Sequence, residues 1–115
     1  MTPRDSESAK ALWEKFLMLI KETDKFFDAD DVDMAMEVIR QSLVIFERID
    51  KLEVDDFKGT PEGSKLLEEL KPIFKRTQFK AMSWLNKSRN RNKAIRSYTE
   101  IGGLNPNGYV FNKKS

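Results

Sequence analysis

Residues 9–27 read AKALWEKFLMLIKETDKFF, and the spacing of their apolar side chains decides the fold class. Apolar or small residues recur every three or four positions, so they lie on one face of an α-helix. The residues on that face are Ala9, Leu12, Trp13, Phe16, Ile20, Thr23 and Phe27. Thr2 and Pro3 are typical of a helix start, and the sequence therefore predicts a first helix over residues 3–27.

Residues 31–52 show the same period. Asp30 or Asp31 can cap this second helix, because a carboxylate accepts a hydrogen bond from free N–H groups and favours the positive end of the helix dipole. The expected core face consists of Ala35, Val38, Ile39, Ser42, Ile45, Phe46, Ile49 and Leu52.

A third helix is predicted to begin at Pro61. Its apolar face continues to Ser88 and keeps its phase across Pro72, so we expect a kink at the proline and no break. The expected face holds Leu66, Leu70, Ile73, Phe74, Thr77, Ala81, Trp84, Leu85 and Ser88. The pattern then pauses and resumes, which extends the expected helix to about Thr99.

Short connections between these helices favour antiparallel neighbours. The predicted fold is all-α: an antiparallel three-helix up-down bundle over residues 1–99, with a four-helix bundle as the alternative. Residues 100–115 form a Gly- and Asn-rich, non-helical tail. The tail carries three consecutive apolar residues, Tyr109, Val110 and Phe111. We expect this triplet to dock near the second and third helices, either in its own chain or in a neighbour's, which leaves a homodimer open.

Catalysis is disfavoured by composition. The chain of 115 residues has no His and no Cys, so most nucleophilic and general-base arrangements lose their usual members. The acids after Phe27 do not fit a calcium-binding EF-hand loop, because Val32 and Ile39 fall where ligands are required. No enzyme activity, cofactor or metal is expected. No long apolar run or signal segment is present in the sequence, so we expect a cytoplasmic protein without membrane insertion.

Charge is distributed unevenly along the chain. Residues 1–70 hold 18 Asp and Glu against 10 Lys and Arg, whereas residues 71–115 hold 11 Lys and Arg and one acid, Glu100. A basic patch is made by Lys87, Arg89, Arg91, Lys93 and Arg96. A basic half is compatible with nucleic-acid binding. The favoured interpretation is that the basic segment pairs with the acidic helices of the same chain.

Several apolar residues exceed what the core needs. Met18, Met36, Val44 and Phe79 fall off the core face, and surplus apolar surface is typical of a binding protein. We expect a groove between the second and third helices that receives a partner's amphipathic helix. The predicted partner-binding residues are Met36, Leu43, Val44, Phe79 and Tyr98. The alternative is that the tail or a fourth helical piece covers the excess.

Three segments together resemble one family. Residues 41–52, QSLVIFERIDKL, resemble the second helix of FliT-type flagellar export chaperones. A basic, Asn-rich stretch at 88–93 leads to Tyr98, and the ending GYVFNKK at 108–114 is similar to that of many members, with Asn112 where Asp is common. The resemblance implies a helical chaperone, without cofactor or catalysis. It would hold the C-terminal region of the filament-cap protein for the export apparatus.

Two alternatives use the same helices differently. A small basic nucleic-acid-binding domain would use the basic patch, although the acidic first two helices disfavour this. A transcription-associated adaptor that docks disordered peptides would use Leu12 and Trp13, but the rest of the pattern fits poorly.

Overall fold

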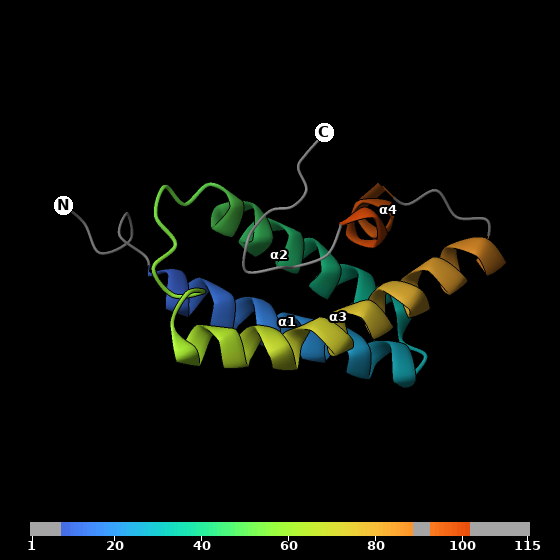
Figure 1. The fold of residues 1–115 in the computed structure, drawn as a ribbon. Helices are drawn as coiled ribbons and strands as arrows, with labels where there is room; N and C mark the ends of the chain where they lie inside the picture. Colours follow the sequence, from blue (N-terminus) through green and yellow to red (C-terminus); the bar gives the residue numbers. More distant parts are fainter. Residues whose placement is uncertain (1–7, 89–92, 102–115) are drawn as a thin grey trace.

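The computed structural model describes residues 8–88 and 93–101. These residues form α1 (Ala9–Asp28), α2 (Val32–Asp50), α3 (Pro61–Ser88) and α4 (Lys93–Glu100). The predicted all-α class is confirmed for this part of the chain, and α1, α2 and α3 run in alternating directions (Figure 1). The predicted non-helical tail, including Tyr109, Val110 and Phe111, lies outside the described residues except for Glu100 and Ile101. Glu100 is the last residue of α4, so the predicted tail begins one residue too early.

The first helix begins at Ala9, so its predicted start at residue 3 is wrong. Ser8 has extended backbone angles, and its side chain accepts a hydrogen bond from the N–H of Ala11 at 3.0 Å. This N-cap satisfies a donor that a longer helix would have bonded internally. Asp31 caps α2 in the same way by accepting from the N–H of Met34, which confirms one of the two predicted caps.

The chain between α2 and α3 contains a core residue that periodicity did not reveal. The second helix ends at Asp50, two residues earlier than predicted, and Phe57 in the following loop is only 5% exposed. The Trp13 indole Nε1 donates to Asp55 Oδ2 at 2.8 Å. The other Asp55 carboxylate oxygen accepts from the N–H groups of Phe57 and Lys58. The loop is thus fastened to α1 and brings an aromatic ring over the end of the core.

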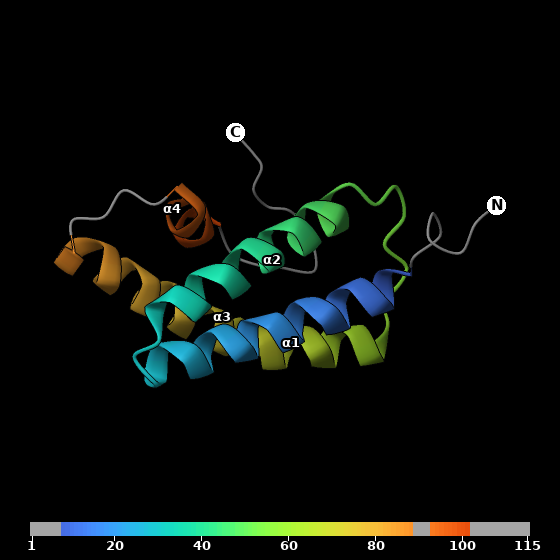
Figure 2. The same ribbon diagram turned by 180° about the vertical axis from the view of Figure 1, so that it is seen from behind.

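The third helix is continuous across Pro72, as predicted. Its first half lies along α1, and its second half rises away from α1 (Figures 1 and 2). Among the described residues, no Cα atom of α2 lies within 8 Å of one in α3. These two helices therefore diverge instead of closing a three-helix bundle.

The space between the diverging helices is occupied by α4. This short helix contacts both α2 and α3, and both views show it nearly end-on, so it crosses the long helices (Figures 1 and 2). The expected extension of the third helix to Thr99 is wrong, because α3 ends at Ser88 and α4 begins at Lys93. The described residues form four helices that pack together, as the four-helix alternative expected, but α4 crosses the others and does not continue the up-down pattern.

The core is formed by the predicted helix faces together with α4. Residues with no exposed surface come from all four helices: Phe16, Ile20, Thr23, Ala35, Ile39, Ser42, Leu70, Thr77, Ala81, Ile95 and Tyr98. Phe16 contacts Phe46 of α2 and Phe74 of α3, and Phe74 in turn meets Tyr98 edge-on at 5.2 Å between ring centroids. This aromatic chain links every helix to α1.

Candidate partner-binding surface

The expected groove between α2 and α3 is filled by α4. Ile95 and Tyr98 insert into it and are fully buried. Tyr98, which was predicted to bind a partner, is therefore a core residue in this structure, and its role in partner binding stays a prediction. Excess apolar surface on α2 and α3 is covered by a fourth helix, one of the two covers anticipated from the sequence.

Tyr98 is held by a hydroxyl pair at the junction of α3 and α4. The Thr77 hydroxyl donates to the carbonyl of Phe74, so the Tyr98 hydroxyl is the donor in its bond to Thr77. Burial raises the pKa of Tyr98 well above its usual value, because the phenolate would lose its hydration. Burying this phenol costs little free energy, because its hydroxyl donates to Thr77, and the bond fixes the position of α4.

The C-terminal end of α4 is secured by one side chain from α3. The Gln78 amide nitrogen donates to the backbone carbonyls of Tyr98 and Ile101, each at 2.9 Å. These carbonyls belong to the last turn of the helix and its exit, where intrahelical partners are missing. Gln78 thus faces α4 and acts as its cap.

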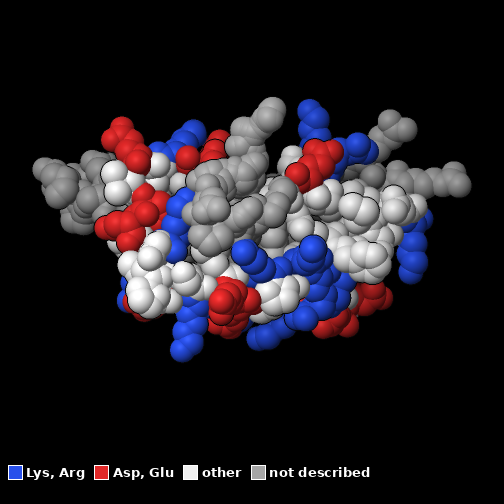
Figure 3. All heavy atoms as spheres, viewed as in Figure 1, with Lys and Arg blue, Asp and Glu red and all other residues white. Residues whose placement is uncertain are grey.

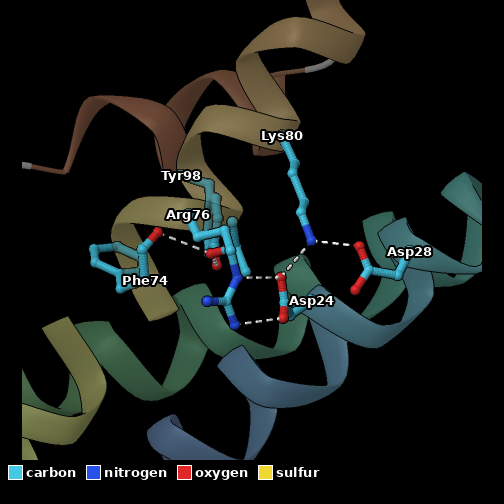
Figure 4. Close-up of polar contacts among 7 residues, drawn as sticks. Asp24, Asp28, Phe74, Arg76, Lys80 and Tyr98 are labelled. Atoms are coloured by element: carbon cyan, nitrogen blue, oxygen red, sulfur yellow. Dashed lines mark hydrogen bonds and ion pairs between the residues drawn. The ribbon is translucent and has the colours of Figure 1, made fainter. Parts of the chain in front are cut away.

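An ionic cluster joins the C-terminal half of α1 to the middle of α3 (Figure 4). Arg76 contacts both carboxylate oxygens of Asp24 through Nε and Nη2, at 3.2 and 2.8 Å. Lys80 bridges Asp24 and Asp28, at 2.7 Å to Asp24 Oδ1. The Arg76 guanidinium, aided by Lys80, holds the pKa of Asp24 below its usual value despite the burial of that carboxyl. Burial alone would lower the pKa of Lys80, but the two carboxylates raise it overall.

This cluster supports the internal interpretation of the charge asymmetry. Arg76 and Lys80 belong to the basic half of the chain, and their partners belong to the acidic half. Two further pairs, Lys10 with Glu62 and Lys21 with Glu69, also join α1 to α3, but all four side chains are about half exposed or more. Exposed pairs of this kind contribute about 0–1 kcal/mol each.

The remaining predicted partner-binding residues are scattered. Met36 and Leu43 are half-buried and pack against the core, whereas Val44 and Phe79 are 51% and 71% exposed. Met18 is exposed as expected at 49%. The structure does not gather these residues into one open groove.

Three further apolar residues are exposed: Met34, Val54 and Met82. The wide apolar arc of the second helix includes Met34, whereas Val54 and Met82 were not singled out from the sequence. Met82 lies three positions after Phe79 and therefore on the same side of α3. Its spacing from Phe79 was the available signal, but Met82 was not assigned to either face.

Three members of the predicted basic patch can be placed. Lys87, Lys93 and Arg96 are exposed, at the end of α3 and on α4. Arg89 and Arg91 lie outside the described residues.

Other kinds of site find no support in the described part of the chain. Over residues 8–88 and 93–101, no group of three acidic side chains is placed to hold a metal ion. None of the four helices is both long and apolar enough to cross a membrane. Comparisons with family models, curated proteins and solved structures gave no match.

Proposed function

We propose that this protein is a non-enzymatic helical chaperone or adaptor that binds a protein client, as its resemblance to FliT-type chaperones implies. The client would be the C-terminal helical region of a filament-cap protein, which the chaperone delivers to the export apparatus in the cytoplasm. The observation that supports protein binding is Phe79, a large aromatic side chain that is 71% exposed in the middle of a well-packed helix.

Exposure of Phe79 has a thermodynamic consequence. Burial of such a side chain contributes roughly 1.5–3 kcal/mol, and the folded chain gains little of this from Phe79. Met82 adds a second apolar side chain on the same side of α3, and Met adapts to partners of varied shape. A client that covers Phe79 and Met82 would bury their apolar surface, and the free energy of that burial would stabilise the complex.

The position of α4 changes the expected binding mode. Because α4 occupies the space between α2 and α3, we propose that the client contacts the outer surfaces of these helices through Phe79 and Val44. Both side chains lie on exposed positions, so binding there does not require the bundle to open.

The test is complex formation with the C-terminal region of the filament-cap protein encoded by the same genome. Size-exclusion chromatography with light scattering should show a stable complex with the wild-type chain. Phe79→Asp should weaken it, whereas Met18→Asp, a matched change at an exposed apolar residue of α1, should not. Absence of a complex with wild-type protein would rule out this client.

Nucleic-acid binding is the second candidate, because Lys87, Lys93 and Arg96 are exposed near one another in sequence. Arg76 and Lys80, two further cations of the basic half, already pair with Asp24 of α1. We expect any such binding to be weak, independent of sequence and steeply reduced by salt. Tight binding at physiological salt would favour this second function over the first.

A further inference from the structure

We infer that the outer surface of α3 docks an acidic amphipathic helix. This surface, the outer α3 face, consists of Lys71, Lys75, Phe79 and Met82, all exposed. The inference deepens the proposed function and rests on it, because it names the chemistry of the segment that a protein partner would present.

The neighbours of α3 define the outer α3 face by elimination. Arg76 and Lys80 point to α1, where they pair with Asp24 (Figure 4). Gln78 points to α4, and Thr77 is fully buried between the helices. Phe79 therefore projects away from every helix that packs against α3.

The residues of the outer α3 face follow helical spacing. Lys71, Lys75 and Phe79 are separated by four positions each, and Met82 follows three positions later, so they form one continuous ridge. The ridge spans roughly 16 Å at 1.5 Å per residue, which is about three turns of a partner helix. Phe79 and Met82 would supply the apolar anchors of a helix–helix contact.

The lysines of the outer α3 face have no ion-pair partner in the part of the chain that the structure describes. Within the described ranges, no ion pair involves Lys71 or Lys75, and residues 71–99 contain no Asp or Glu. Figure 3 shows Lys and Arg gathered over the middle of α3, with uncharged surface beyond them. Complementary charge on a partner would stabilise the encounter and fix its orientation. Carboxylates flanking an apolar stripe meet this requirement.

An anionic membrane meets the charge requirement less well. A bilayer presents a broad surface, and a protein lying on it would also bring part of its acidic first 70 residues near the lipid headgroups. A helix docked along the ridge covers a narrower surface than a bilayer does, so it meets less of that repulsion. The outer α3 face also offers only two exposed apolar side chains, a small area for insertion into lipid.

Fluorescence anisotropy with the full-length protein tests this inference. The probe is a labelled amphipathic helical peptide with Leu at positions i, i+3, i+4 and i+7 and Glu on both flanks. A second peptide carries Lys in place of Glu. We expect the Glu peptide to bind and Lys75→Glu to weaken that binding at least about fivefold. Lys15→Glu, an exposed lysine of α1 without an ion pair among the described residues, is the matched control and should change binding less than about twofold.

Two further comparisons sharpen the result. Phe79→Ser should weaken binding of the Glu peptide, whereas Met18→Ser should leave that binding unchanged. The Lys peptide should bind wild-type protein poorly and should gain affinity for Lys75→Glu. Equal binding of both peptides to wild-type protein, or equal effects of Lys75→Glu and Lys15→Glu, would overturn the inference. Binding to phosphatidylserine vesicles without binding to the Glu peptide would also overturn it, in favour of lipid.

Failure of this inference is distinct from failure of the proposed function. If the filament-cap fragment binds wild-type protein and Lys75→Glu equally well, the client stands and the acidic chemistry is wrong. If the fragment does not bind wild-type protein at all, the client is wrong, and the peptide measurements still decide whether the outer α3 face recognises acidic helices.

Discussion

Replacing Gly63 by alanine should destabilise the fold, against the ordinary preference of helices. Gly63 lies in the first turn of α3, where the Thr60 hydroxyl accepts a hydrogen bond from its N–H at 2.9 Å. A Cβ atom at this position would lie 1.9 Å from the carbonyl oxygen of Phe57 and 2.9 Å from the Cα of Lys58. Both are backbone atoms, so no side-chain rotation relieves the overlap.

The size of the effect follows from two opposed terms. Alanine in a helix is favoured over glycine by at most about 1 kcal/mol. An ordinary contact of 3.4 Å would require a displacement of about 1.5 Å. The loop cannot move freely, because the buried ring of Phe57 and the bonds of Asp55 hold it in place. Overpacking of this kind costs about 1–3 kcal/mol, and an overlap this deep with backbone atoms belongs at the upper end of that range. Subtracting about 1 kcal/mol for the helix preference of alanine leaves an expected net loss of about 2 kcal/mol.

Gly59→Ala is the matched control. Nothing lies within 4 Å of the position that its Cβ would take, and its backbone is not in the left-handed region. The change should be neutral or stabilise by about 0.4–1 kcal/mol, because alanine restricts the unfolded chain. Urea unfolding followed by circular dichroism gives both free energies. A thermal midpoint should fall by about 4–8 °C for each kcal/mol lost. Gly63→Ala unfolding at the same urea concentration as Gly59→Ala would refute the close approach of loop and helix.

Leu70→Ala should lower the free energy of unfolding by about 2–5 kcal/mol, because Leu70 is fully buried. Val44→Asp changes an exposed position, so its free energy of unfolding should stay within about 0.5 kcal/mol of wild type. If the Val44 variant unfolds, this residue belongs to the core. The lowered pKa of Asp24 means that its ion pairs stabilise the fold above the usual carboxyl pKa and that this contribution disappears as the pH falls through the lowered value. Urea titrations should therefore show that acid pH lowers the free energy of unfolding less in Asp24→Asn than in wild type. Equal losses of unfolding free energy in the two proteins would contradict the role of the cluster. The raised pKa of Tyr98 has the opposite effect on the pH dependence of stability. The folded state keeps the phenol neutral, so the free energy of unfolding should fall as the pH rises above about 10. Tyr98→Phe should reduce this alkaline loss while costing about 0.5–1.5 kcal/mol at neutral pH through the missing bond to Thr77, and an unchanged alkaline profile would argue against a buried phenol.

The sequence by itself determined the first three helices and most of their buried faces. Phe16, Ile39 and Leu70 were recognised as core because helical periodicity is a local property that chain neighbours define. Local chemistry also identified the cap at Asp31 and the start at Pro61. The exposure of Phe79 followed from the same periodicity, because Phe79 falls off the core face of its helix.

Only the tertiary structure decided where the last helix lies and which surface stays open. Whether Tyr98 faces solvent or core depends on the divergence of α2 and α3, which no local pattern encodes. Phe57 belongs to a loop without periodicity, and its burial depends on Asp55 reaching Trp13 across 42 positions of sequence. The ion pairs of Arg76 and Lys80 with α1 likewise join residues more than 50 positions apart. Such contacts form because folding brings distant segments together, and they determine that the outer α3 face, not the space between α2 and α3, remains accessible to a partner.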